Sequence, residues 1–413
     1  MALLGVKNQS VLLTLPFPIS QTWTCGLSGI VRVLITGGGG SGAAGKSNAS
    51  NDQGFLVTGG GAGGCSEKII SVTAGDTYTI TIGAGGIGKN IATNAGKGIQ
   101  AGNAGGASRF VTASGTTIDL NAGGGGAGQG ENLTGTGSAV AGGTGGSASG
   151  GSRNAVGGAG GAQLASAHVT CQNATGGGAV GIWGNVGNAG GLIAPATSSN
   201  HNDGKNACSG GGGVGGVGGG VTINATYKVA TNFASGTGGG SGGPGTDNAS
   251  DEVSGTNTTL MGNRPTNGGV HQGSAAVLAN FGTNRDFTIN LSAIAGANNQ
   301  GATFNGIIAN ELLMPVGQGG AFNVGAGDAT RGIAYPGGGG GGFSSSATGA
   351  NYATLFGGGG GKVCNTDATE LNQPMGGAGG GGGGGMGATT NAGVAFSGAG
   401  GNGICIIQYL SFA

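Results

Sequence analysis

Charged side chains are scarce in this chain of 413 residues. Asp, Glu, Lys and Arg together make up 7% of it, where about 25% is usual. The formal net charge is zero, and no run of like charge suggests an acidic tail or a basic arm. Nucleic acid is therefore not an expected partner, because binding to a phosphate backbone needs a basic face that releases its counterions.

Long apolar runs are missing as well. No stretch approaches the roughly 18 apolar residues of a membrane span, so we expect no membrane insertion. The nearest thing to a signal-peptide core is residues 11–19 (VLLTLPFPI), which contain Pro16 and Pro18. Only Lys7 supplies a preceding positive charge, and no small-residue cleavage site follows. We therefore predict a strand in this stretch.

Cysteine and histidine are few and scattered. No two cysteines form C-x-x-C, so zinc is not expected, and the cysteines are too sparse for a disulfide-built miniprotein. Isolated buried thiols and three bridges between sequence neighbours both fit the spacing. The three histidines lie far apart in polar, loop-like sequence, which does not favour a metal or catalytic role. These residues are Cys25, Cys65, Cys171, Cys208, Cys364, Cys405, His168, His201 and His271.

Glycine is what the chain has in excess, with 111 residues against an ordinary share of about 7%. The glycines form runs with irregular spacing, separated by segments rich in Asn, Ser, Thr and Ala. Good helix formers other than Ala are scarce, and no window shows convincing helical periodicity. We therefore expect almost no α-helix. The longest runs span residues 37–45, 59–64, 123–130, 142–151, 176–191, 210–220, 238–245, 337–342, 357–361 and 376–387.

Strand signals cluster near the two ends of the chain. Residues 68–82 alternate around Ala74-Gly75-Asp76, which predicts two strands joined by a turn. In the last strand, Cys405, Ile407 and Tyr409 are expected on one face, with Ile404 and Ile406 on the other. The other predicted strands are residues 28–35, 116–120 and 403–410, with weaker ones at 221–227 and 287–294.

The glycine runs themselves could be flexible linkers, the usual fate of such tracts. Collagen is excluded, because there is no strict G-X-Y period and only eight prolines. The remaining structure is a bundle of polyglycine rods in the extended threefold conformation, which has about 3.1 Å rise and no internal hydrogen bonds. Its N–H and C=O groups must find partners on neighbouring rods, and close packing leaves no room for a Cβ. Ala, Ser, Val and Asn within the runs should then mark outward-facing positions.

One motif is typical of a nucleotide hydrolase. Gly40, Gly45, Lys46 and Ser47 complete a G-x-x-x-x-G-K-[ST] pattern after an apolar run. A phosphate-binding loop needs a helix N-terminus after it, but turn-forming sequence follows here. In so glycine-rich a chain a chance match is expected about once in ten such sequences. We interpret the match as accidental, with Lys46 and Ser47 in the first loop after the first rod.

No other enzyme signature has its structural context. Residues 239–243 match G-x-S-x-G, but no strand–elbow–helix surrounds them. Glycan hydrolysis needs two carboxyl groups about 5–9.5 Å apart, and among the scattered acids only Asp251 and Glu252 are adjacent. We therefore predict no enzyme and no cofactor.

Four short motifs occur in a characteristic order along the chain: WTCGLSGIVRVLITGGGG, VTAGDTYTITIGAGG, LNAGGGGAG and GGNGICIIQY. This order resembles the glycine-rich domain of bacteriophage tail fibres and tail-tip adhesins. The resemblance covers roughly residues 23–410. Ala74 stands where such domains often have Pro, and a low-glycine insert at about residues 246–316 is long, so the tip loops are not predicted.

The resemblance implies an all-β fold with a sandwich-like base, packed polyglycine rods and long surface loops. It implies an N-terminal attachment segment (residues 1–22) followed by the glycine-rich domain (residues 23–413). It also implies an extracellular virion protein, a receptor-binding adhesin that attaches the virion to the host cell. The receptor would be a bacterial outer-membrane protein or polysaccharide. Other tail or fibre proteins would be partners, and a homo-oligomer, with a trimer favoured, is expected. Aromatic side chains supply contact area at low entropic cost, which makes these residues receptor-contact candidates: Trp183, Tyr227, Tyr335, Phe343, Tyr352 and Phe356.

Two other classes of protein share parts of this pattern. A virion decoration or fibre spacer would have the same rods without a receptor site. An ice-binding polyglycine protein would need a flat, regular face lined by Thr or Ala. For each aromatic candidate, simple coverage of a rod end is the competing interpretation.

Overall fold

The computed structural model describes residues 13–46, 55–91, 98–113, 118–132, 138–162 and 394–412, together with nine short strands between residues 172 and 388. These residues contain no helix and are about 47% strand. The predicted all-β fold is confirmed for this part of the chain.

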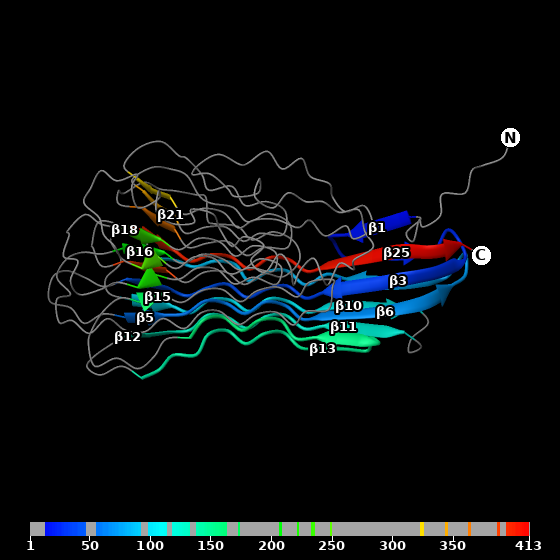
Figure 1. The fold of residues 1–413 in the computed structure, drawn as a ribbon, viewed down its shortest axis with the longest axis horizontal. Helices are drawn as coiled ribbons and strands as arrows, with labels where there is room; N and C mark the ends of the chain where they lie inside the picture. Colours follow the sequence, from blue (N-terminus) through cyan, green and yellow to red (C-terminus); the bar gives the residue numbers. More distant parts are fainter. Residues whose placement is uncertain are drawn as a thin grey trace.

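Two five-stranded antiparallel sheets pack face to face at one end of the molecule, on the right in Figure 1. We call this sandwich the base. The first sheet has the order β1 (Leu13–Phe17), β25 (Ile404–Phe412), β3 (Gly29–Thr36), β6 (Cys65–Val72) and β14 (Arg153–Ala155). The second has the order β13 (Ala148–Ser149), β11 (Asp119–Ala122), β10 (Ser108–Thr112), β7 (Thr77–Thr81) and β2 (Gln21–Thr24).

These strands match the predictions near the chain ends. The run at residues 11–19 yields β1, and residues 68–82 yield β6 and β7 around a turn in which Gly75 has φ +95°. Residues 116 and 117 of the strand expected at 116–120 lie outside the described residues, as do residues 223–227 of the strand expected at 221–227 and the whole of 287–294. The boundary that we expected between an attachment segment (residues 1–22) and the glycine-rich domain (residues 23–413) falls inside β2. Strand β1, which lies in the expected attachment segment, pairs along its length with β25 of the glycine-rich domain.

The core of the base follows the alternation of its strands. Cys405, Ile407 and Tyr409 of β25 lie in the buried cluster, and Ile404 and Ile406 lie on the opposite face, as predicted. Rings of β1, β2, β7 and β10 form a continuous row across the two sheets. Successive ring centroids in the row Phe17, Trp23, Tyr78 and Phe110 are 6.3, 5.3 and 4.9 Å apart. Such pairs add to the stability gained from burial alone.

In the described part of the chain, eight extended glycine-rich segments continue the base strands toward the other end of the molecule (Figure 1). We call them rods. Rods 1, 3, 5 and 7 follow β3, β7, β11 and β14, and rods 2, 4, 6 and 8 lead into β6, β10, β13 and β25. The rods are residues 37–43, 58–64, 83–89, 101–107, 123–129, 141–147, 156–162 and 397–403, in that order.

Rod 1 shows the threefold conformation directly in its hydrogen bonds. Its N–H groups donate in rotation to rods 2, 4 and 8, with N···O distances of 2.7–3.1 Å. Each direction recurs at every third residue, which is the repeat of a threefold helix. The donor–acceptor pairs are Gly37–Gly64, Gly38–Gly106, Gly39–Gly401, Gly40–Gly61, Ser41–Asn103, Gly42–Gly398 and Ala43–Thr58.

Close packing of the rods requires glycine at their interior positions. A Cβ placed on Gly40 would lie within 3.0 Å of the carbonyl oxygen of Gly126 in rod 5. A Cβ on Gly60 would come equally close to the carbonyl oxygen of Gly40. Because these neighbours are backbone atoms, no side chain can move aside to make room. The predicted packed-rod bundle is confirmed for the eight rods.

The expectation that other residues in the runs face outward is wrong for the two central rods. Ser41, Ala43, Thr58 and Ala62 are fully buried. The two hydroxyl groups accept backbone N–H groups of neighbouring rods, and Ala43 packs against Val57 at the rod end. No contact in the structure explains why alanine occupies the buried position 62.

The expectation holds in the outer rods, where it follows a period of three. Every third residue is a residue other than glycine and is exposed or half-buried. The residues between these positions are glycine, apart from Asn103 and the rod-end residues Lys89 and Ser397. The outward residues are Ala84, Ile87, Ala101, Ala104, Ala107, Ala141, Thr144, Ser147, Val156, Ala159, Ala162, Ala399 and Asn402.

Candidate functional site at the distal end of the rods

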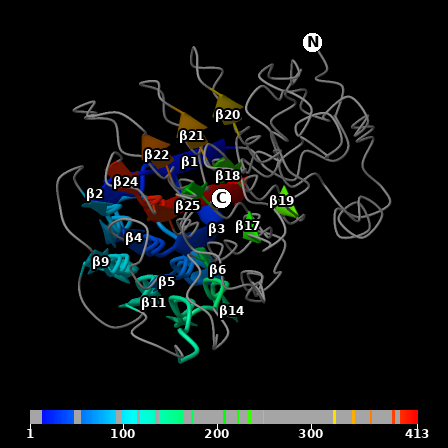
Figure 2. The same cartoon turned by 90° about the vertical axis from the view of Figure 1, so that its left-hand side faces the viewer.

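Three five-stranded sheets of very short strands lie at the end of the rods opposite the base, on the left in Figure 1 and toward the viewer in Figure 2. We call this the distal end. Three of their strands directly follow rods 1, 3 and 5: β4 (Ala44–Lys46), β8 (Asn90–Ile91) and β12 (Gly130–Asn132). Two directly precede rods 2 and 4: β5 (Phe55–Val57) and β9 (Gly98–Gln100). One strand, β24 (Val394–Phe396), precedes rod 8.

The other strands of the distal end come from the later part of the chain. They are β15 (Gln172–Asn173), β16 (Asn206–Cys208), β17 (Val221–Thr222), β18 (Phe233–Ser235), β19 (Asn248–Ala249), β20 (Asn323–Gly325), β21 (Phe343–Ser345), β22 (Lys362–Cys364) and β23 (Met386–Ala388). The sheet orders are β12-β5-β15-β17-β19, β18-β16-β23-β4-β9 and β20-β21-β22-β24-β8.

The two ends of the molecule differ in how they connect strands. At the base, β6 and β7 are joined by residues 73–76 and β13 and β14 by residues 150–152. At the distal end, β4 and β5 are joined by residues 47–54, and β19 and β20 by residues 250–322. All described strands from β15 to β24 lie at the distal end. The longest stretches of sequence between described strands therefore leave from and return to this end.

The predicted receptor-contact residues lie almost entirely outside the described residues. This holds for Trp183, Tyr227, Tyr335, Tyr352 and Phe356, and for most of the insert at residues 246–316. The exception is Phe343, whose backbone begins β21 at the distal end and pairs with Asn323 and Lys362. How the candidate side chains lie relative to one another is therefore outside the described part of the chain.

The glycine-rich loop motif does not form a phosphate cradle. The N–H groups of residues 40–43 all donate to other rods, so none is available to a phosphate. Lys46 ends strand β4, whose residues pair with β23 and β9, instead of starting a helix or lying in the loop that we expected. Ser47 lies outside the described residues. The described backbone of the motif therefore belongs to rod 1 and strand β4.

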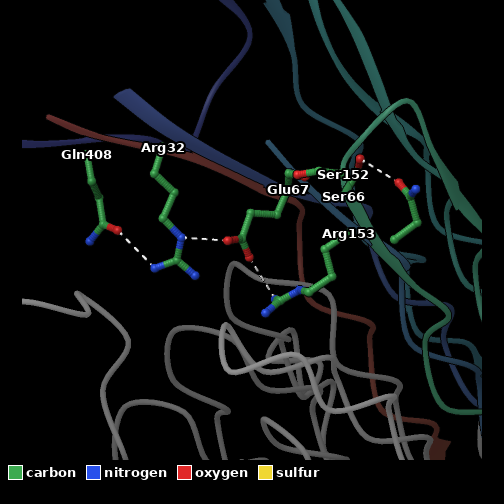
Figure 3. A network of polar contacts seen from close by, with 7 residues as sticks. Arg32, Ser66, Glu67, Ser152, Arg153 and Gln408 are labelled. Carbon is green, nitrogen blue, oxygen red and sulfur yellow. Dashed lines mark hydrogen bonds and ion pairs between the residues drawn. The ribbon is translucent and has the colours of Figure 1, made fainter. Parts of the chain in front are cut away.

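A network of charged and polar side chains lies on the face of the first base sheet opposite the core (Figure 3). Glu67 of β6 lies between two arginines, with Oε1 at 2.8 Å from Arg32 Nε and Oε2 at 2.9 Å from Arg153 Nη2. Arg32 also donates to Gln408 Oε1 at 3.2 Å. Because register places Arg153 directly opposite Glu67, the network ties β14, β6, β3 and β25 together across the sheet. This is a structural network at the base, away from the distal end.

The three described cysteines, Cys25, Cys65 and Cys405, are free and buried, which favours isolated thiols for this half of the set. Burial raises the pKa of the Cys65 thiol to about 12, and it raises the pKa of Cys405 as well. Cys25 Sγ lies 3.0 Å from Tyr409 Oη. Burial, followed by this contact, raises the pKa of Tyr409 to about 12. Cys65, Cys405 and Tyr409 are therefore neutral at physiological pH, and the two thiols are poorly suited to nucleophilic chemistry.

Within the described ranges, no group of three or more His, Cys, Asp or Glu side chains is placed to hold a metal ion. The same part of the chain contains no helix that is long and apolar enough to cross a membrane.

Sequence reasoning predicted that residues other than glycine face outward, but it missed the period of three that they follow in the outer rods. Their signal is a local x-G-G triplet, as in AGGTGGS at residues 141–147 and AGNAGGA at residues 101–107. The triplets keep phase only within one rod, because each strand and turn that follows resets it. A search for a period of three over the whole chain therefore finds none.

Comparisons of the chain with protein-family models and with curated protein sequences found no match.

Proposed function

We propose that the chain is a component of a bacteriophage tail fibre or tail tip that attaches the virion to the surface of its bacterial host. The observation that supports this proposal is the contrast between the two ends of one rigid bundle. The base has short turns and a side-chain core, whereas the distal end gathers the long inter-strand stretches of the chain. An attachment protein needs this combination of a fixed scaffold and connections that can vary.

Changes in the distal connections should have little effect on the stability of the rod lattice, by which we mean the eight rods and the hydrogen bonds between them. Its cohesion comes from backbone hydrogen bonds between rods and from glycine packing, neither of which involves the distal connections. Sequence between two rods can therefore change without unpacking a side-chain core. The proposal places this chain outside the cell, in contact with other tail or fibre proteins at the base and with an outer-membrane protein or polysaccharide at the distal end. We further propose that the mature protein is a homo-oligomer, with a trimer favoured.

The direct test is the adsorption of particles carrying altered chains to host cells. Two distal alterations are informative: the double variant Phe343→Ala with Tyr352→Ala, and removal of residues 251–316. We expect at least a ten-fold lower adsorption rate constant for one of them. The matched control is Thr22→Ala with Thr24→Ala, two exposed residues of the base strand β2, which should adsorb normally.

A fibre spacer or virion decoration without receptor binding is the alternative. It predicts normal adsorption for every distal variant, together with failure of the purified chain to bind host cells. Localising the chain by labelled antibody separates the two further. A position at the distal tip of a fibre favours attachment, and a position along the shaft or on the capsid favours the alternative.

Ice binding is a second candidate that one observation favours. The outward positions of rods 3, 4 and 6 carry mostly Ala and Thr at three-residue intervals, which is the regular face such a function needs. Ile87, which is 67% exposed, and the exposed Arg109–Asp119 pair of the adjoining sheet interrupt this face. Thermal hysteresis of the purified chain would support ice binding, and its absence would remove the candidate.

A further inference from the structure

Outer rods have backbone N–H groups that donate to no other residue in the described part of the chain. Rod 4 illustrates the arrangement. The N–H groups of Gly102 and Gly105 donate to rod 5, and that of Gly106 donates to rod 3. The N–H groups of Ala101, Ala104 and Ala107 donate to no other described residue, and these residues are exposed. The N–H groups of the outward residues of rods 3, 6, 7 and 8 likewise donate to no other described residue, and these residues are exposed apart from the half-buried Ala159, Ala162 and Ala399.

A row of unused N–H groups at a fixed interval is a template for another chain, as it is at the edge of a β-sheet. The rod lattice has no intrinsic limit, because a threefold rod donates in three directions and can be surrounded on all sides. A glycine rod from a second copy of this chain would therefore extend the bundle in the same way that rod 4 extends it beyond rod 1.

The side chains at the outward positions prevent that approach. At the inward positions of rod 4, a Cβ on Gly105 would lie within 3.0 Å of the carbonyl oxygen of Gly38, and a Cβ on Gly102 would clash in the same way with Ser41. The space that a Cβ needs is thus the space that a neighbouring rod's carbonyl oxygen fills. A Cβ at an outward position would compete for the same space. The buried Ser41, Ala43, Thr58 and Ala62 show that the central rods accommodate a Cβ at single positions, whereas the outer rods carry one at every third residue.

The outward residues differ in every property except the possession of a Cβ. They include Ala, Thr, Ser, Asn, Val and Ile, and Ile87 and Val156 are 67% and 50% exposed. A binding surface would select for a particular chemistry, whereas steric exclusion requires only that glycine be absent. We propose that these side chains terminate the rod lattice and keep its faces from pairing with the rods of a second copy of this chain.

The test replaces the outward alanines of rod 4 with glycine, as Ala101→Gly, Ala104→Gly and Ala107→Gly together. The matched control carries Ser at the same three positions, which retains each Cβ. Sedimentation velocity over a hundred-fold concentration range should show one assembly size for the wild type and the Ser variant. The Gly variant should at least double its weight-average mass at the highest concentration, with the N–H groups of residues 104 and 107 becoming protected from hydrogen exchange.

A Gly variant that retains the wild-type circular dichroism spectrum and the wild-type mass at every concentration would overturn the proposal. If glycine at all three positions unfolds the chain, the equivalent variant of rod 6 (Ala141→Gly, Thr144→Gly, Ser147→Gly) replaces it. Hydrogen exchange of the wild type is decisive without any variant. Fast exchange at Ala104 and Ala107 at high concentration is expected, and protection there would mean that rods pair between copies despite their side chains.

Discussion

At the scale of single residues, a buried serine hydroxyl can take over the role of a carbonyl group as the acceptor of a backbone N–H of a rod. Ser41 Oγ accepts the N–H of Asn103 at 2.8 Å, and Ser397 Oγ accepts that of Lys89 at 2.9 Å. Ser108 Oγ accepts the N–H of Gly83 where rod 3 begins. All three serines are fully buried, so the hydrogen bonds compensate the loss of water.

Ser41→Ala should destabilise the chain because it leaves the Asn103 N–H without its acceptor. The expected loss is roughly 1–3 kcal/mol in the free energy of unfolding, the usual cost of an unsatisfied buried donor. Ser147→Ala is the control, since that side chain is exposed on rod 6. Urea unfolding followed by circular dichroism measures both. Equal midpoints for the two variants would contradict this role of the hydroxyl.

Alkaline pH should weaken the base through its buried acids. Burial raises the pKa of Cys65 from 9.0 to about 12, and burial with the Asp76 carboxylate raises that of Tyr78 from 10.0 to about 12. Each group is neutral when folded but ionises more readily when unfolded. Its contribution to stability is therefore complete below about pH 9 and is lost as the pH rises toward 12.

The measurement is the free energy of unfolding at a series of pH values between 7 and 12. It should be level up to about pH 9 and fall above it. Thiol reagents at pH 8 should label Cys25, Cys65 and Cys405 only when the chain unfolds, because all three are buried. Rapid labelling of the folded chain at these positions would show that the base opens readily.

At the scale of elements, a rod depends on its glycines as a strand depends on its alternation. Gly40→Ala should be strongly destabilising, because its Cβ would meet the Gly126 carbonyl oxygen and neither backbone can give way. Overpacking of this kind costs roughly 1–3 kcal/mol and more where the surroundings are rigid. Gly26→Ala is the matched control, since a Cβ there meets nothing within 4 Å. Thermal unfolding compares them, and equal tolerance would argue against close packing of rod 1.

The sequence was sufficient to predict the strands near the chain ends and the existence of the rods. It was not sufficient to predict which rods pack against one another. Alternation identified β6, β7 and β25, including the inward face of Cys405, Ile407 and Tyr409. Which rods contact one another depends on hydrogen bonds between residues far apart, such as Gly39 with Gly401. Every glycine run looks alike in sequence, so nothing local indicates that rods 1 and 2 are central and tolerate a buried serine or threonine.

At the scale of the whole molecule, the base and the rods form one continuous structure. Thr36 ends β3 and Gly37 begins rod 1, whose first N–H donates to Gly64, the residue before β6. The distal aromatic candidates were beyond sequence reasoning for a related reason. Their positions depend on how the long stretches between distal strands are arranged, and composition carries no information on that arrangement.

The continuity of base and rods predicts that they unfold together. Ile80 is buried in the base on β7, which leads into rod 3 and not into rod 1 or rod 2. Ile80→Ala should reduce the free energy of unfolding by about 2–5 kcal/mol, through lost burial and the cavity it leaves. If the molecule is one cooperative unit, hydrogen-exchange protection of the Gly40 and Gly61 amides in the central rods should fall by the same free energy. Central rods that keep wild-type protection while the base is destabilised would instead be an independent unit, held by their own lattice of backbone hydrogen bonds.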